Sequence, residues 1–378
     1  MVAPTLDHDE QLYWLALQLT PGLGARKSAQ LVRHFQSPRA VFRASLSELE
    51  GLGIPAATAQ SLLSGCMFDD AATQQQKLLG LNVALIPMLD PRYPQCLRDI
   101  FDPPPVLYCR GRVELLDTLS IGIVGTRKPS PYGIAATEHL SRELAVKGFT
   151  VTSGMARGID TAAHRAALEA GGNTIAVLGC GVDQVYPAEN RKLAAEIVLK
   201  GLLLSEFPMG TPAFPQNFPV RNRIVSGLSA GILVIEGAQY SGSAITARLA
   251  VEQGRELYAV PGNITSKMSW APNLLIKQGA KLVQEADDVI AELHEDQRRR
   301  LRRAPPSGPQ QITLTPEMDS PVARAVLGVL SPDQPTHIDT LMENLPQYSS
   351  SELIAALFEL EMLGLVRQLA GKHFLIVW

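Results

Sequence analysis

The stretch SIGIVGTRKPSPYG, residues 120–133, decides the fold hypothesis for this chain. A short apolar run at 121–124 breaks into Gly-Thr-Arg-Lys at 125–128, and Pro131 stands where a helix can begin. A strand, a glycine turn and a helix start together form the turn that holds a phosphate in α/β proteins. The stretch matches neither G-x-G-x-x-G nor G-x-x-x-x-G-K-[ST], so the rest of the chain has to identify the anion.

The surrounding region, residues 75–293, repeats this alternation of apolar runs and helical patterns. Short continuous apolar runs are typical of parallel strands that helices cover on both faces. The region therefore predicts an α/β fold built on a doubly wound parallel sheet. We expect strands at residues 82–86, 120–125, 149–154, 173–179, 201–206, 231–237 and 256–262.

The N-terminal region, residues 1–74, predicts a small helical domain. It contains two similar glycine-turn-and-helix units, LTPGLGARKSAQLVRHF at 19–35 and LEGLGIPAATAQSLL at 49–63. Such units occur in helix-hairpin-helix modules that grip a DNA backbone through turn amides, and a plain helical bundle is an equal alternative. Only the first unit carries cations on its helix, at Arg26, Lys27 and Arg33.

The C-terminal part begins with a linker at 294–319, where five arginines precede Pro-Pro-Ser-Gly-Pro. The arginine run is interpreted as a solvated helix end, with a weak nucleic-acid contact as the alternative. Residues 320–378 predict three helices and a hairpin turned at Ala370–Gly371, which is a winged-helix pattern. This domain has three Lys and Arg and six Asp and Glu, 3 − 6 = −3, so we expect it to contact protein rather than duplex DNA.

The bulk composition limits the classes of function. With a net charge of −3, any cations that bind nucleic acid have to gather in one groove. The four cysteines are far apart and form no C-x-x-C pair, which indicates a reduced cytoplasmic protein without structural zinc. No signal peptide and no run of 18 apolar residues is found, so no membrane association is expected.

The first strand-to-helix loop is expected to bind phosphate at the carboxyl edge of the sheet. Gly125 lets the backbone approach an anion, Thr126 and Ser130 can donate hydrogen bonds, and Arg127 and Lys128 supply full charges. Two cations would crowd a buried pyrophosphate. They suit an exposed, repeating phosphate backbone better.

Two further loops offer anion contacts, each with a plain helix cap as the alternative. In SGMARGID, Ser153 and Gly154 end a strand, and Arg157 and Gly158 precede a helix that Asp160 could cap. In the loop EGAQYSGSAITARLA, Gly242 and Ser243 stand at the head of a helix. Between these loops, Cys180 resembles a nucleophile, but no histidine is within local reach, so we interpret it as a buried small residue.

The long loop FPMGTPAFPQNFPVRNRIVSGLS, residues 207–229, gives the strongest functional signal. Aromatic rings that alternate with cations and amides are typical of single-stranded nucleic-acid binding, because bases stack on rings while arginines contact phosphates. The alternative is that both phenylalanines anchor the loop to the core, and we expect at least one to face the groove. The expected DNA contacts are Phe214, Asn217, Phe218, Arg221, Asn222 and Arg223.

No catalytic machinery is apparent in these loops. There is no carboxylate pair at catalytic spacing, no G-x-S-x-G, no H-E-x-x-H and no Walker lysine. Glu206 and Glu236 end strands, and we interpret each as a partner of an arginine. We therefore expect no catalytic residues, no metal and no cofactor.

Taken in order, the motifs GIVGTRKPSPYG, TSGMARGID, LGCGVD, FPQNFPVRNRIVSGLS and GSAITARLA resemble the DNA-processing protein A family, DprA or Smf, over about 190 residues. The resemblance implies an extended Rossmann-like domain, flanked by a sterile-alpha-motif or helix-hairpin-helix domain and a winged-helix-like domain. It implies a non-enzymatic protein that binds incoming single-stranded DNA during natural transformation. The family's DNA-contacting arginine falls on Arg127, and its aromatic and basic contacts fall on Phe214, Phe218, Arg221 and Arg223.

The same resemblance implies partners and leaves two alternatives open. The partners are the RecA recombinase, single-strand-binding protein and a second copy of the chain, joined through the Rossmann domain. One alternative is a nucleotide N-glycosidic hydrolase, although residues 241–246 lack the paired glycines and the acid of that loop. The other is a dinucleotide-dependent oxidoreductase, which the missing fingerprint glycines disfavour.

Overall fold

The computed structural model describes residues 7–239, 241–303, 320–331 and 334–376. Its N-terminal part is helical, and helix α1 packs along α6. Buried Trp14 and its neighbours join one hydrophobic cluster with the adjoining strands, so the helices rest directly on the sheet domain. These helices are α1 (His8–Leu19), α2 (Ala25–Phe35), α3 (Pro38–Val41), α4 (Leu46–Gly51), α5 (Ala56–Ser64) and α6 (Phe68–Gly80).

The central part is a nine-stranded sheet in the order β1-β2-β6-β5-β4-β3-β7-β8-β9. Neighbouring strands from β6 to β9 in this order run parallel, whereas β2 is antiparallel to β1 and to β6. The strands are β1 (Ala84–Pro87), β2 (Val106–Gly111), β3 (Ser120–Val124), β4 (Thr150–Ser153), β5 (Asn173–Val177), β6 (Leu202–Ser205), β7 (Gly231–Val234), β8 (Glu256–Ala259) and β9 (Lys281–Leu282).

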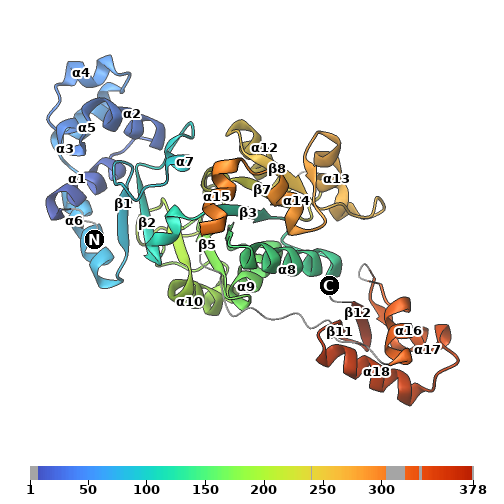
Figure 1. Ribbon diagram of the computed structural model, residues 1–378. Coiled ribbons are helices and arrows are strands. Elements are labelled where there is room, and N and C mark those ends of the chain that lie inside the picture. Colours follow the sequence, from blue (N-terminus) through green and yellow to red (C-terminus); the bar gives the residue numbers. More distant parts are fainter. Residues whose placement is uncertain (1–6, 240, 304–319, 332–333, 377–378) are drawn as a thin grey trace.

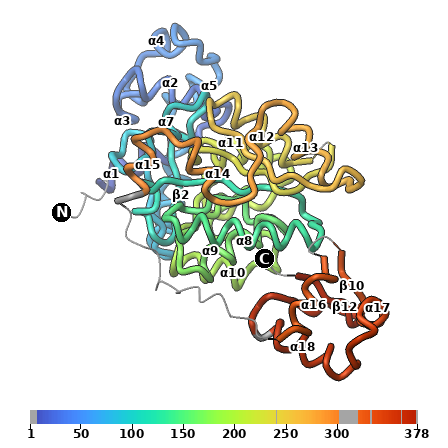
Figure 2. The backbone as a smooth tube through the Cα atoms, turned by 45° about the vertical axis from the view of Figure 1, so that its right-hand side comes forward, coloured from blue at the N-terminus to red at the C-terminus, as the bar shows by residue number. Residues whose placement is uncertain are grey.

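Helices cover both faces of this sheet, as Figures 1 and 2 show. On one face, α8, α9 and α14 share a hydrophobic cluster with β3 and β4. On the other face, α11 and α12 pack into the cluster that contains Trp14. The helices of this part are α7 (Gln95–Arg98), α8 (Pro131–Val146), α9 (Ile159–Glu169), α10 (Arg191–Lys200), α11 (Asn217–Leu228), α12 (Gly242–Glu252), α13 (Trp270–Lys277), α14 (Ala286–Ala291) and α15 (Glu295–Arg303), with 3-10 turns at Val113–Asp117, Ala188–Asn190 and Lys267–Ser269.

The α/β class and the doubly wound sheet are confirmed, and all seven expected strands are present. The prediction missed β2, which follows the Pro103–Pro105 run, and β9, which is two exposed residues long. It also missed that the β1 edge is antiparallel. Turn-forming prolines masked β2, and β9 is too short for an apolar period to show.

The strand order reverses beside β3, which has β4 on one side and β7 on the other. In doubly wound sheets, ligands bind outside the carboxyl ends of the strands at such a switch point. The opening stretch of the sequence lies there: β3 ends at Val124, and α8 begins at Pro131 with Ser130 as its N-cap. The fold therefore directs attention to the loop between these residues.

The C-terminal part forms the expected winged helix, with α16 (Pro321–Val329), β10 (Thr336–His337), α17 (Ile338–Asn344), α18 (Ser350–Met362), β11 (Val366–Leu369) and β12 (His373–Ile376). The β11–β12 hairpin turns at residues 370–372, where Gly371 has φ of +80°. Arg367 on this hairpin donates to Glu138 of α8 at 2.9 Å, so the domain lies beside helix α8 of the central part (Figure 1).

Part of the predicted linker is helical, since residues 295–303 form α15. Residues 304–319 lie outside the described residues. Within the part of the chain that the structure describes, no helix combines the length and the apolar character that a membrane span requires. The exact limits of the domains stay predictions.

Candidate nucleic-acid groove

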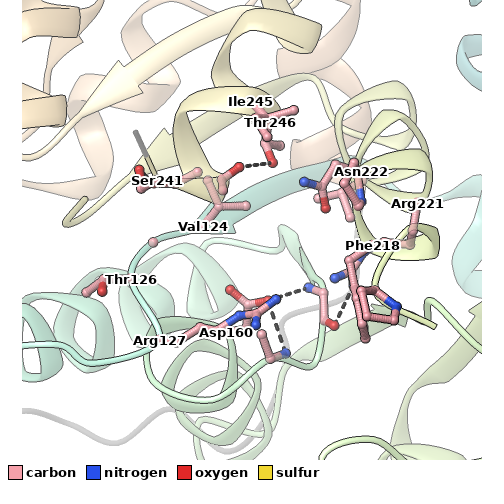
Figure 3. A pocket seen from close by; sticks show the side chains of 18 of the residues that line it. Val124, Thr126, Arg127, Asp160, Phe218, Arg221, Asn222, Ser241, Ile245 and Thr246 are labelled. Carbon is pink, nitrogen blue, oxygen red and sulfur yellow. Dashed lines mark hydrogen bonds between the residues drawn. The ribbon is translucent and has the colours of Figure 1, made fainter. Parts of the chain in front are cut away.

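A cavity of about 670 Å³ opens at the switch point, and we call it the central groove. The loop after β3 lines one side, the loop after β4 lies below it, and α11 and the start of α12 close the other side. Figure 3 shows Arg127, Asp160 and Phe218 across the cavity from Ser241 and Thr246. Ten predicted contacts line it: Gly125, Thr126, Arg127, Lys128, Gly154, Phe218, Arg221, Asn222, Gly242 and Ser243.

The cations of the first loop are free to meet a ligand. Arg127 and Lys128 are exposed, and neither forms an ion pair with any other described residue. The Arg127 guanidinium carbon lies 5.6 Å from the centroid of the Phe218 ring, a cation–π contact at the edge of the groove. A nucleotide whose phosphate contacts Arg127 could therefore stack its base on the Phe218 ring.

Ser130 forms hydrogen bonds within the protein, and its contact with DNA stays a prediction. Its backbone N–H donates to Glu236 Oε2 at 2.9 Å, and its hydroxyl donates to Glu236 Oε1 at 2.5 Å. The same hydroxyl accepts the Gly133 N–H at 3.1 Å and so caps α8. Ser130 therefore holds the loop in place, and buried Glu236 partners this serine rather than an arginine.

The bottom of the groove is organised by Arg221, which is 4% exposed. Its Nη1 donates to the carbonyls of Gly154 and Val177, which follow β4 and end β5. A Cβ added at Gly154 would collide with this Nη1 atom, so any larger residue there would displace the guanidinium group. Arg221 thus joins two strand ends and presents a buried positive charge beneath the cavity.

Asp160 lies opposite this arginine and accepts hydrogen bonds from the N–H groups of Gly154 at 3.1 Å and Ala156 at 3.2 Å. Burial raises the pKa of Asp160, and the nearby Arg221 charge opposes that rise. Burial likewise lowers the pKa of Arg221, and Asp160 counteracts it. The carboxylate therefore orders the loop after β4 and is engaged rather than free to act as a base.

Aromatic rings line the mouth of the groove. Phe218 packs against Tyr186 with ring centroids 5.4 Å apart, and Tyr186 is 42% exposed. Phe214 is exposed but does not line the groove. Asn217 donates to the Gly179 carbonyl at 3.1 Å, which fixes the start of α11. The expectation that at least one of the two phenylalanines faces the groove is therefore confirmed for Phe218.

The start of α12 forms the opposite rim. Ser241 is its N-cap and makes no side-chain cap hydrogen bond, so the first turn of α12 lacks that acceptor. Ser241 and Ser243 hydroxyls lie 2.7 Å apart. A helix N-terminus of this kind favours an anion, and Gly242 leaves the approach open.

Seven predicted contacts lie outside the cavity lining: Ser130, Phe214 and Asn217, described above, and Ser153, Arg157, Gly158 and Arg223. Ser153 is buried and donates to the Ile123 carbonyl at 2.6 Å. Arg157 is exposed and pairs with Glu189 at 2.8 Å. Gly158 has φ of +75°, and a Cβ there would meet the Thr126 carbonyl at 2.5 Å. The glycine therefore allows the loop after β3 to pack closely against it. Arg223 is 5% exposed and points away from the groove, toward Glu206.

Tyr186, Asp160 and Thr246 are among the lining residues that the predicted contacts do not include. Tyr186 lies in the loop after β5, where a single aromatic residue has no cation directly beside it. Asp160 was expected only as a helix cap, and the buried Arg221 that faces it could not be located from spacing. Thr246 lies one turn into α12 and lines the groove, in keeping with the helical period of that segment.

No activated nucleophile or metal cluster accompanies the groove in the part of the chain that the structure describes. Cys180 is buried, as expected, and burial raises its pKa to about 11. His164 is buried with its pKa lowered to about 3, and its Nδ1 lies 2.7 Å from Thr174 Oγ1. Among the described residues, no group of three or more His, Cys, Asp or Glu side chains is placed to hold a metal.

Comparison with known proteins identifies a family that matches this chain. Residues 84–294 match the family model for DNA recombination-mediator protein A, and residues 305–372 match the DprA winged helix domain. The Synechocystis protein Smf is 34% identical over 405 residues, which cover 97% of this chain and 99% of that protein.

Two solved structures of DNA processing protein A are also similar. The Streptococcus pneumoniae structure has 33% identity and a TM-score of 0.67, and the match covers 77% of this chain and 99% of that one. The Helicobacter pylori structure, which addresses that protein's single-stranded DNA binding mode, has 36% identity and a TM-score of 0.50. That match covers 54% of this chain and 93% of the other.

Proposed function

The chain belongs to the DNA-processing protein A family, DprA or Smf, and from that premise we propose that it binds single-stranded DNA without sequence preference. In this proposal it protects incoming DNA during natural transformation and helps to load a recombinase of the RecA type. The Helicobacter pylori relative, studied for its single-stranded DNA binding mode, supports the ligand class.

The observation that carries the proposal is the meeting of Arg127 and Lys128 with Phe218 at one sheet edge. The groove contains three cations against the single engaged carboxylate of Asp160. Its lining is suited to phosphate contact and to stacking, and neither of these depends on base identity. We infer that a strand crosses the opening with its phosphates toward the cations and its bases toward the rings.

A direct titration tests this proposal. We expect an oligothymidylate to bind tightly, with the logarithm of the association constant falling by about 0.7 per phosphate contacted as the logarithm of salt concentration rises. Mixed-sequence oligonucleotides of equal length should bind similarly. Fluorescence anisotropy across a salt series provides the measurement. Weak binding that does not respond to salt would contradict the proposal.

We propose that the groove has no catalytic role. The N-glycosidic hydrolase alternative needs a free acid near the α12 loop, whereas Asp160 accepts two amide hydrogen bonds and Glu236 is held by Ser130. Incubation with nucleoside monophosphates and chromatography for released base distinguishes the alternatives. Release of free base above the uncatalysed rate would favour the hydrolase.

The remaining partners are part of the same proposal. A protein that transfers a strand to a recombinase would act in the cytoplasm and would contact RecA and single-strand-binding protein. We also propose a homodimer formed through the Rossmann domain, whose surface carries exposed apolar side chains such as Ile264 and Trp270. Sedimentation of the full chain measures that assembly directly.

A further inference from the structure

A second cavity, of about 550 Å³, lies between the N-terminal helices and the central domain. We call it the hairpin pocket. It is lined by Gly24, Arg26 and Lys27 of the first glycine-turn unit and by Phe101, Val220 and Arg223 of the central domain. The two acids that also line it, Asp102 and Glu206, bind Arg223 at 2.9 Å and 2.5 Å.

Charges in the hairpin pocket favour an anion. Arg26 and Lys27 form no ion pair with any described residue, so their charges are not neutralised locally. Counting all five charged side chains, the pocket holds three cations and two acids, a net of +1. Arg223 is 5% exposed, and its Nη1 atom has no hydrogen-bond partner among the described residues although this side chain lines the cavity.

The backbone adds to that field. Helix α2 is eleven residues long and begins at Ala25 with Gly24 as N-cap, so no side chain caps its first turn. A Cβ added at Gly24 would meet only open space, and Gly22 has φ of +77°. The turn therefore presents uncapped N–H groups beside Arg26, an arrangement that binds phosphate.

An aromatic ring completes the pocket. Phe101 is 73% exposed, which is unusual for so large an apolar side chain. The Arg26 guanidinium carbon lies 4.3 Å from the centroid of this ring. The central groove has the same pairing, between Arg127 and Phe218. An exposed ring with a cation beside it can stack a base while the cation meets its phosphate.

Helix α11 connects the two cavities. Phe218, Arg221 and Asn222 on one side of it line the central groove, whereas Val220 and Arg223 on the other side line the hairpin pocket. The two openings are thus separated by about the width of one helix, roughly 10–12 Å. A strand that leaves the central groove can cross α11 and reach the second cavity.

We propose that the hairpin pocket is a second binding site for the same single strand, holding a phosphodiester at α2 and a base on Phe101. This inference rests on the proposed function and extends it, because it assigns the N-terminal domain a part in DNA binding. It predicts that only oligonucleotides long enough to reach both cavities use Arg26 and Phe101.

Length dependence tests the inference. Oligothymidylates from about 4 to about 16 nucleotides span the usual range of site sizes for a single module. We expect Arg26→Ala to bind the short ones like wild type and the longest ones about three- to tenfold more weakly. Its salt slope with the longest strand should fall by about 0.7, the value for one lost phosphate contact.

Two further variants make the test specific. Phe101→Ala should weaken binding of long strands without changing the salt slope, because it removes stacking and no charge. Arg43→Ala removes one exposed cation from the same domain outside the pocket, and it should behave like wild type at every length.

The outcomes separate the two proposals. If the wild-type chain binds none of the lengths, the proposed function fails and this inference fails with it. If wild type binds but Arg26→Ala and Phe101→Ala match it at every length, only the second site is refuted. The same conclusion follows if both variants lose equal affinity for short and long strands.

Discussion

Arg127→Ala is expected to weaken oligothymidylate binding by about 1.5–3 kcal/mol, the usual contribution of a hydrogen bond to a charged group. The dissociation constant would then rise between about tenfold and more than a hundredfold. Arg127 is exposed and forms no ion pair with another described residue, so its loss should lower the free energy of unfolding by no more than the cation–π contact with Phe218 contributes, about 0.5–1 kcal/mol. Anisotropy titration measures the affinity, and urea denaturation measures the stability.

The contact between Arg127 and Phe218 refines this prediction. Phe218→Ala should cost about 1–3 kcal/mol of binding free energy through lost stacking. Because the two side chains touch, the double variant should lose less than the sum of the single losses. Arg165→Ala is a matched control, since Arg165 is exposed on α9 and does not line the groove. Wild-type affinity in Arg127→Ala would remove the main support for the proposed function.

The sequence located this groove because of how the sheet is built. Parallel strands bring successive strand-to-helix loops to one edge, so Arg127, Gly154, Phe218 and Gly242 meet although they span more than a hundred positions. Continuous apolar runs predict such strands well because both faces are covered. The same reasoning does not predict β2, which follows a run of prolines, or β9, which is too short to show an apolar run.

The sequence predicts the positions of individual side chains less well than it predicts the fold. The segment at residues 207–229 shows the reason. Its prolines and turn residues predict an irregular loop, whereas residues 217–228 form helix α11. On a helix, side chains two positions apart point to nearly opposite sides, so Arg221 and Arg223 cannot share one groove. A helical period applied to this stretch would have separated them. The Ser130–Glu236 pair spans 106 positions, and no local pattern could have indicated it.

Arg223→Ala is expected to lower the free energy of unfolding by about 3–5 kcal/mol, the usual cost of removing one partner from a buried ion pair. Arg223 Nη2 lies 2.5 Å from Glu206 Oε2, and both side chains are at most 10% exposed. The other partner, Asp102, is 39% exposed and can turn to water. The loss therefore comes mainly from leaving the Glu206 carboxylate buried without its cation. Urea denaturation followed by circular dichroism measures it.

The pH dependence of the stability lost in Arg223→Ala shows whether the buried Glu206 carboxylate is its cause. Burial already raises the pKa of Glu206 above its ordinary value, and Arg223 opposes that rise. Without the arginine, the pKa in the folded state should rise further above the unfolded value of about 4.3. A carboxyl whose folded pKa is raised stabilises the fold below its unfolded pKa and loses that contribution as pH rises through the folded pKa. The deficit of Arg223→Ala relative to wild type should therefore shrink as pH is lowered from about 7 toward about 4.3.

Glu206→Gln added to Arg223→Ala should restore part of the stability at neutral pH and remove this pH dependence. A deficit that is constant with pH, or that the second substitution leaves unchanged, would show that packing and not the buried carboxylate accounts for the loss.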